Sequence, residues 1–233
     1  MKIRVIGLNH KTSPISVREK LTFSGTQVSD TLVQLKEKFP EAEFALLSTC
    51  NRTEIYLAAR RDTIPDTDKL VRVISDIREV ETETFKSFLY VHDNEEAARH
   101  LLTVATSLDS LVVGESQIVA QVKESYRLAV KAKCTGKVLN RLFHCAFATS
   151  KEVYTLTSIA QRRVSVAGVA IGLAKQLFEN IAAARVAVIG AGEMGELLVR
   201  HLLEVGCKDI TVFNRTFRRA GAMAEEYNIA AGE

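Results

Sequence analysis

The chain has 233 residues and a formal net charge of +3 at pH 7; 47% of its residues are hydrophobic and 25% are charged. These values are ordinary for a globular protein that buries its core in one large or two small domains. With three prolines and no low-complexity tract, the composition excludes a disordered or collagen-like chain. The mild positive charge permits a nucleic-acid partner but does not argue for one.

Membrane-spanning and secreted classes do not fit the sequence either. No apolar run approaches the roughly 18 residues of a membrane span. A His-Lys pair interrupts the short apolar N-terminus, which is therefore no signal peptide. The four cysteines are too few and too scattered for a disulfide framework. We therefore expect a cytoplasmic protein.

The first 92 residues predict a β-α-β-β-α-β order. The expected strands are residues 2–8, 44–49, 53–59 and 85–92. The expected helices, in which apolar residues recur at helical spacing, are residues 27–38 and 66–80. This order is that of the split βαβ, or ferredoxin-like, arrangement.

Residues 94–180 follow an almost entirely helical pattern. Asp93 or Asn94 is expected to cap the first of these helices. The acidic Glu95 and Glu96 would then lie in its first turn, where the helix dipole favours them.

The pattern changes again at Ala184, where a strand, a glycine-rich turn, a helix and a second strand form a βαβ unit. A further helix and the start of a strand are expected before the chain ends. A full dinucleotide-binding sheet has about six strands, so we expect this one to be incomplete at its C-terminus. The predicted fold class is α/β: an α+β ferredoxin-like domain with added helices at residues 1–155, then a partial Rossmann domain at residues 156–233.

The glycine-rich turn carries the pattern G-x-G-x-x-G at Gly190, Gly192 and Gly195, after a strand and at the start of a helix. The first glycine permits the tight turn, the second lets the backbone approach a pyrophosphate, and the third lets the helix pack on the strand. The helix N-terminus then offers N–H groups to phosphates. The alternative is a tight turn that binds no ligand.

The end of the second strand distinguishes the two nicotinamide cofactors. NAD sites usually carry Asp or Glu about 20 residues after the glycines. Here the strand ends at Asn214 and Arg215, with Arg218 and Arg219 just beyond. These arginines would attract a 2′-phosphate, so the sequence favours NADP. The alternative places them in a solvated loop.

Cys50 lies at the C-terminal end of an apolar strand, beside a polar turn. Arg52 nearby would favour its thiolate, which can attack an acyl carbon and form a thioester. The alternative is a small buried hydrophobe, which is also the interpretation for the other three cysteines, Cys134, Cys145 and Cys207. Their spacing is not that of a zinc site, and we expect no metal.

A thiol nucleophile together with a nicotinamide cofactor indicates one class of reaction. An activated acyl group is captured as a thioester, and a hydride reduces it to an aldehyde. An aldehyde dehydrogenase runs the same steps in reverse. The residues alone leave the acyl donor open.

Five stretches, in order and spanning nearly the whole chain, resemble glutamyl-tRNA reductase, the first enzyme of the route from glutamate to tetrapyrroles such as heme. They are GLNHKTSP at 7–14 followed by Arg18-Glu19, STCNRTEIY at 48–56, SLDSLVVGESQIVAQVK at 107–123, GKVLNRLFHCAF at 136–147, and VIGAGEMG before FNRT at 188–216. The set of five is far more specific than any one of them.

The resemblance implies that Cys50 attacks the ester of glutamyl-tRNA and that NADPH reduces the thioester to glutamate-1-semialdehyde. It implies that His100 is catalytic and moves protons, and that Arg52 pairs with the glutamate carboxylate. From the residues alone, His100 would be an ordinary helix histidine, and Gln117 and Gln121 a polar helix face. The implied substrate-binding residues are Thr49, Asn51, Arg52, Ser110, Glu115, Ser116, Gln117 and Gln121. The implied cofactor-binding residues are Gly190, Ala191, Gly192, Glu193, Met194, Gly195, Asn214 and Arg215.

Partners are implied in the same way. They are glutamyl-tRNA, the aminomutase that receives glutamate-1-semialdehyde, and a second copy of the full-length protein in a V-shaped homodimer. Because family members are roughly twice as long as this chain, it is not expected to dimerise by that route. The chain also departs from the family pattern at several positions. They are Ser107, Ser116 and Ala120 in the pocket stretch, and Tyr154 and Leu156 between the two domains.

Two other functions stay open on the sequence. A chain that keeps the fold but binds tRNA or a partner protein without turnover would explain the altered pocket and the short length. An NADP oxidoreductase of the shikimate-dehydrogenase type would share the nucleotide turn, although the first 150 residues do not resemble that family.

Overall fold

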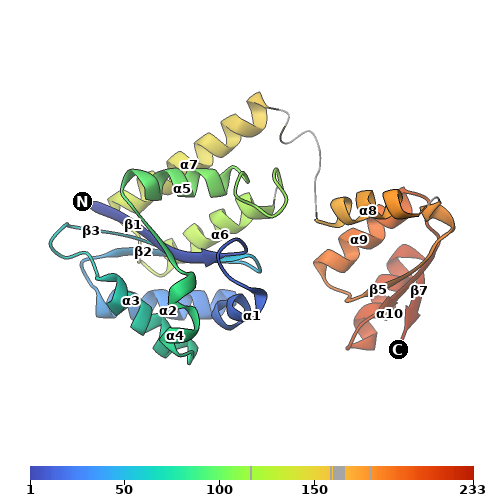
Figure 1. Ribbon diagram of the computed structural model, residues 1–233, viewed down its shortest axis with the longest axis horizontal. Helices are drawn as coiled ribbons and strands as arrows, with labels where there is room; N and C mark the ends of the chain where they lie inside the picture. Colours follow the sequence, from blue (N-terminus) through green and yellow to red (C-terminus); the bar gives the residue numbers. More distant parts are fainter. Residues whose placement is uncertain (116, 158, 160–165, 179) are drawn as a thin grey trace. The chain divides into compact units, whose positions relative to one another are not determined.

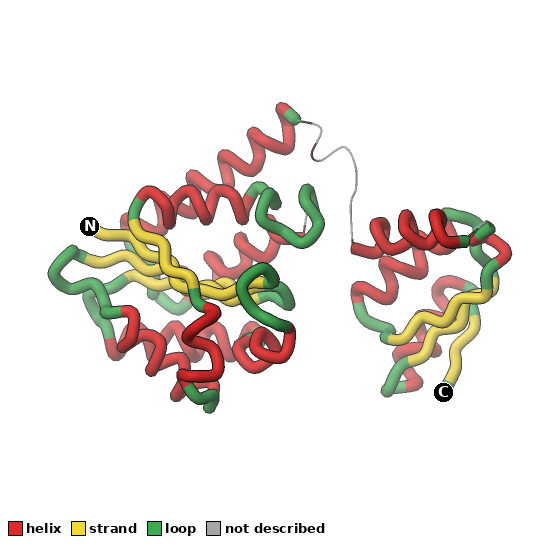
Figure 2. Tube along the Cα trace, in the orientation of Figure 1, coloured by secondary structure: helices red, strands yellow, loops and turns green. Residues whose placement is uncertain are grey.

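The computed structural model describes residues 1–115, 117–157, 159, 166–178 and 180–233. The chain folds as two compact units, Met1–Arg162 and Arg163–Glu233. Each unit has its own sheet (Figure 2). Each also has its own hydrophobic core.

The first unit is built on a four-stranded antiparallel sheet. Its strands are β1 (Lys2–Asn9), β2 (Glu43–Ser48), β3 (Arg52–Ala59) and β4 (Tyr90–Asp93), in the spatial order β2-β3-β1-β4. Two longer helices connect them: α2 (Gly25–Lys38) between β1 and β2, and α3 (Thr67–Arg78) between β3 and β4. This is the predicted ferredoxin-like order.

Helices cover both faces of this sheet (Figure 1). One face carries α2, α3 and the short α1 (Ile15–Arg18) and α4 (Thr82–Phe85). The other face carries α5 (Glu95–Ala105), α6 (Gln117–Lys131) and α7 (Lys137–Leu156). Short 3-10 turns at Glu19–Leu21 and Lys86–Phe88 follow α1 and α4. Because the sheet is enclosed, every residue of β3 is buried.

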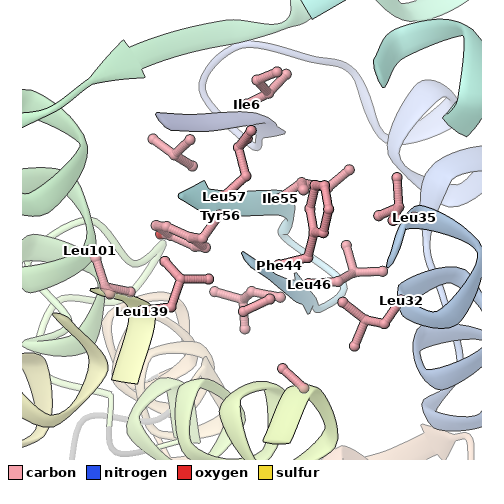
Figure 3. Packing of buried hydrophobic residues seen from close by; sticks show 14 of the residues in the cluster. Ile6, Leu32, Leu35, Phe44, Leu46, Ile55, Tyr56, Leu57, Leu101 and Leu139 are labelled. Atoms are coloured by element: carbon pink, nitrogen blue, oxygen red, sulfur yellow. The ribbon is translucent and has the colours of Figure 1, made fainter. Parts of the chain in front are cut away.

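The core draws on both faces. Phe44 and Leu46 of β2 lie near Leu32 and Leu35 of α2, and Tyr56 of β3 lies on the side of Leu101 and Leu139 (Figure 3). The Tyr56 ring also meets Phe143 of α7 edge-on, at 5.7 Å between centroids. Alternation along β3 therefore points Arg52, Glu54 and Tyr56 towards the α5–α7 layer.

Two sequence-based expectations are wrong in this unit. The predicted strand 85–92 is a strand only from Tyr90, because Phe85 and Phe88, three residues apart, belong to consecutive helical turns and Phe85 is buried. The side-chain cap expected on α5 does not form: Asn94 occupies the N-cap position, but its side chain makes no capping hydrogen bond. The Asp93 carboxylate binds Arg4 and Lys2, and Asn94 Oδ1 accepts from the backbone N–H of Ile3. Glu95 and Glu96 do lie in the first turn, as expected.

The second unit contains the predicted βαβ unit and extends it. Strands β5 (Arg185–Ile189), β6 (Asp209–Phe213) and β7 (Ala230–Gly232) are parallel and lie in that order. Helix α9 (Glu193–Glu204) connects β5 to β6, and α10 (Phe217–Tyr227) connects β6 to β7. Helix α8 (Val166–Leu177) and a 3-10 turn at Ile181–Ala183 precede β5. This topology is one half of a doubly wound dinucleotide-binding sheet.

The four cysteines differ in their exposure. Cys134 and Cys207 are buried and Cys50 is exposed, as expected. Cys145 is also exposed, which corrects the prediction of a buried hydrophobe, because it lies on a face of α7 that the core does not cover. Among the described residues, no helix is long and apolar enough to cross a membrane.

Candidate active site

Cys50 lies in the tight turn that joins β2 to β3. The Thr49 N–H donates to the Arg52 carbonyl at 2.8 Å and closes the turn. The Thr49 hydroxyl accepts from the backbone N–H groups of Asn51 and Arg52, both at 3.1 Å. These bonds fix the backbone on both sides of Cys50, while its side chain stays exposed.

The loop after β1 supports this turn from the other side. The His10 N–H donates to the Asn51 carbonyl at 2.9 Å, and Arg18 Nε donates to the Cys50 carbonyl at 3.4 Å. The His10 backbone and the Arg18 side chain thus both support the cysteine turn. Burial, followed by the charge of Arg52, lowers the pKa of His10.

A pocket with an empty volume of about 360 Å³, its open mouth included, lies beside Cys50. It brings together the predicted substrate-binding residues that the structure describes; the remaining one, Ser116, lies outside the described part of the chain. Leu111 and Ile118, which the sequence did not single out, add apolar surface. The lining residues are Thr49, Cys50, Asn51, Arg52, Ser110, Leu111, Glu115, Gln117, Ile118 and Gln121.

Arg52 is the cation of this pocket, and its side chain is only 2% exposed. Its Nη1 donates to Glu54 Oε1 at 2.6 Å, and its Nη2 donates to Asp109 Oδ2 at 3.0 Å. Burial lowers the pKa of Arg52, but the charge and the hydrogen bond of Glu54, together with the neighbouring Tyr90 and Tyr56, raise it overall. The guanidinium is therefore charged, and two carboxylates hold it in place.

Glu54 is fully buried and accepts from further side chains besides Arg52. The Tyr56 hydroxyl donates to its Oε2 at 2.6 Å, while the Tyr90 hydroxyl and His100 Nε2 reach its Oε1 at 2.5 and 2.9 Å. Burial raises the pKa of Glu54, but the His100 hydrogen bond and the Arg52 charge together lower it to about 2. His100 thus lies against Glu54, and it is not among the residues that line the Cys50 pocket.

Asp109 connects its own loop to the end of β1, to the loop after β1 and to the start of β3. Its carboxylate binds Arg52 and Lys11 and accepts from Asn9 Nδ2 at 3.3 Å. Burial raises the pKa of Asp109, but hydrogen bonds from Lys11 and Arg52 lower it overall. Asp109 precedes Ser110 and so anchors the segment that carries Ser110 and Glu115. Burial raises the pKa of Glu115, which faces the pocket.

Sequence reasoning missed four residues of this site: Glu54, Tyr56, Tyr90 and Asp109. A signal for two of them was present, because Arg52, Glu54 and Tyr56 recur with period 2 in an otherwise apolar strand. Polar side chains on one face of a buried strand need partners, and that need indicates a polar network. Tyr90 and Asp109 gave no comparable signal, because contacts with them depend on the tertiary fold.

The glycine-rich turn of the second unit has the geometry of a diphosphate cradle. Gly190 has a φ of +114°, and its N–H donates to the Phe213 carbonyl at 2.8 Å. A Cβ on Gly195 would lie 1.9 Å from the Gly190 carbonyl oxygen, so the close packing of α9 on the turn needs glycine. A Cβ on Gly192 would meet no protein atom within 4 Å. Space at this glycine is therefore open to a ligand.

The other predicted cofactor residues surround this turn. Asn214 Oδ1 accepts from the Ala191 N–H at 3.2 Å, which ties the end of β6 to the turn. Arg215 is exposed just after β6, and Glu193 and Met194 are exposed in the first turn of α9. No side chain caps α9, so its first N–H groups can receive a phosphate. These residues fit a bound dinucleotide.

Comparisons with known proteins agree with both units. Residues 6–157 match the family model "Glutamyl-tRNAGlu reductase, N-terminal domain", and residues 172–232 match the model "Shikimate / quinate 5-dehydrogenase". Over 228 residues the chain is 44% identical to a glutamyl-tRNA reductase of Geotalea uraniireducens, covering 98% of this chain and 52% of that protein. It is 41% identical to a glutamyl-tRNA reductase of Pseudomonas aeruginosa over 231 residues, covering 99% and 54%.

A solved structure gives the same picture. The glutamyl-tRNA reductase from Methanopyrus kandleri matches with a TM-score of 0.64 and 31% identity, over 99% of this chain and 53% of that chain. The chain thus spans about half the length of the relatives it matches. The shikimate-type match covers the nucleotide-binding unit and none of the Cys50 pocket.

Proposed function

The chain belongs to the glutamyl-tRNA reductase family, and we propose that it performs that family's reaction on glutamyl-tRNA. The observation that carries the proposal is the exposed Cys50, fixed in a rigid turn at a polar pocket that contains Arg52. A nucleophile needs both access and a defined position relative to its acyl donor.

In the proposed reaction, the Cys50 thiolate attacks the ester carbonyl of glutamyl-tRNA. The new C–S bond replaces the C–O bond, and the terminal ribose hydroxyl of the tRNA leaves with a proton. The positive charge of Arg52 attracts the substrate carboxylate. Because both terminal nitrogens of Arg52 already bind carboxylates, the amides of Asn51, Gln117 and Gln121 supply additional donors to that group.

We assign the second unit to NADPH, with the diphosphate over Gly192 and the 2′-phosphate near Arg215. When bound, NADPH supplies the hydride that reduces the thioester to glutamate-1-semialdehyde and frees the Cys50 thiol. The proposal further places the protein in the cytoplasm, with the aminomutase as recipient of the aldehyde. For the full-length protein we propose the homodimer that the family resemblance implies.

The experiment is intact mass spectrometry after mixing the chain with glutamyl-tRNA without NADPH. A glutamyl adduct is expected on the wild type, and its absence is expected in Cys50→Ser. Cys145→Ser is the matched control, because Cys145 is the other exposed cysteine, and it should keep the adduct. A folded wild-type chain that forms no adduct would instead favour the binding module without turnover.

A further inference from the structure

Glu54 accepts from four protein donors, three of them at Oε1 and one at Oε2. An ionised carboxylate offers about four lone-pair sites. Four donors reach it within 2.9 Å, namely Arg52, Tyr56, Tyr90 and His100. Because the Glu54 side chain is fully buried, water does not replace a lost donor, and the loss of any of the four donors costs stability.

This arrangement fixes the proton on His100. A carboxylate can only accept, so the Nε2 atom of His100 must carry the hydrogen that it shares with Glu54. The Tyr90 hydroxyl donates its hydrogen to Glu54. Its oxygen lies 3.5 Å from His100 Nε2, and we treat this as a contact between neighbours that fixes no proton. Ring packing holds the imidazole in place, because the Tyr90 and His92 rings each lie 5.2 Å from it between centroids.

His100 therefore contacts Glu54 and does not line the pocket, while Arg52 contacts Glu54 and also lines the pocket. We propose that His100 is a positioning residue, which acts on the substrate through Glu54 and Arg52, and that Tyr90 shares this role. In this arrangement the imidazole orients the carboxylate, and the carboxylate sets the direction of the guanidinium. The proposal rests on the proposed function, since it concerns the orientation of Arg52 towards the glutamyl group.

Two conservative substitutions separate positioning from proton transfer. His100→Gln places an amide Nε2–H where the imidazole Nε2–H stood, so it can still donate to Glu54, but it cannot carry protons. His100→Ala removes the donor as well. A proton-moving histidine would fail in both variants, whereas a positioning histidine fails only in the second.

The rate of Cys50 acylation by glutamyl-tRNA should be followed by mass spectrometry at several substrate concentrations. We expect His100→Gln to remain within about 3-fold of wild type and His100→Ala to lose about 100-fold at low substrate, which is the effect of a small misplacement. Tyr90→Phe should fall between them. The loss should lie mainly in the half-saturating concentration, because Arg52 contacts bound substrate. Circular dichroism checks that each variant is folded. Equal losses in His100→Gln and His100→Ala would overturn the proposal.

A second measurement needs no substrate. In a ¹⁵N-labelled chain at neutral pH, NMR should show the His100 proton on Nε2, and a proton on Nδ1 alone would overturn the assignment. If the wild type shows the Nε2 proton but is never acylated, the proposed function fails and the hydrogen-bonded arrangement stands. If the wild type is acylated but His100→Gln is not, the positioning role fails and the proposed function stands.

Discussion

The buried carboxylate of Glu54 makes the stability of the first unit depend on pH in a way that the structure predicts. Its pKa falls from the ordinary 4.5 to about 2 on folding, because the His100 hydrogen bond and the Arg52 charge outweigh burial. A carboxyl group with a lowered pKa stabilises the fold above its unfolded pKa, and this contribution disappears as the pH falls towards the folded value. The difference of about 2.5 between the two pKa values corresponds to about 3 kcal/mol at pH 7. About 2 kcal/mol of this is lost by pH 3.

Glu54→Gln keeps the size of the side chain and removes its charge. At pH 7 we expect the free energy of unfolding of the variant to be about 3–5 kcal/mol lower than that of the wild type. This is the usual cost of removing one partner of a buried ion pair and leaving the other charge buried. The difference in the free energy of unfolding between wild type and variant should then decrease by about 2 kcal/mol between pH 7 and pH 3. Asp93, whose pKa the Arg4 hydrogen bond lowers to about 2, titrates in the same range, but it is present in both proteins and cancels in the difference.

Urea unfolding followed by near-ultraviolet circular dichroism of tyrosine is the suitable assay. The chain has no tryptophan, and all of its five tyrosines except Tyr227 lie in the first unit. Glu124→Gln is the control, because its pair with Arg127 is exposed and should hardly change the unfolding curve. A gap between wild type and Glu54→Gln that is the same at pH 7 and pH 3 would refute the reasoning, since Glu54 would then not be an ionised, paired carboxylate.

Three more predictions concern other parts of the chain. Glu43 of β2 accepts from the first N–H groups of α7, at 3.1 Å from Val138 and 2.7 Å from Leu139, so Glu43→Ala should cost about 1–3 kcal/mol and speed hydrogen exchange at those amides. Gly195→Ala should destabilise the second unit by about 1–3 kcal/mol in thermal unfolding, whereas Gly192→Ala should leave the unfolding temperature unchanged and weaken NADPH binding measured by fluorescence. Arg215→Glu should lower the preference for NADPH over NADH by about 10-fold or more in the same titration.

Each of these has an outcome that contradicts it. Unchanged exchange at Val138 and Leu139 in Glu43→Ala would show that the carboxylate does not cap α7. Wild-type NADPH affinity in Gly192→Ala would favour the turn without a ligand. An equal loss of both cofactors in Arg215→Glu would place the 2′-phosphate elsewhere.

The sequence was sufficient where local pattern decides the structure. The β-α-β-β-α-β order follows from periodicity, and the turn before α9 follows from three glycines, of which Gly190 and Gly195 are required by backbone geometry alone. The strand predicted at residues 85–92 begins only at Tyr90, because a short apolar run fits a strand or a helical turn equally well. Only the packing of Phe85 against the core distinguishes the two.

The candidate site, like the fold, was predictable where a continuous sequence stretch defines it and not where tertiary packing does. The motifs around Cys50 and Gln117 named the pocket residues, because each motif is a continuous stretch and the fold had only to bring two stretches together. The polar partners beneath the pocket lie only partly in these stretches: Glu54 of β3 belongs to the Cys50 motif, whereas Tyr90 lies on β4 and His100 on α5. The sequence around a helical histidine does not indicate which strand that histidine faces. Its hydrogen-bond partner, and hence its role, therefore cannot be predicted before the sheet order is known. The expectation that His100 moves protons came from resemblance, whereas the contact with Glu54 comes from tertiary structure. The resemblance assigns proton transfer to the His100 imidazole, whereas the contact with Glu54 assigns it a positioning role. His100→Gln distinguishes the two roles, because glutamine keeps the hydrogen bond to Glu54 but cannot take up or release a proton.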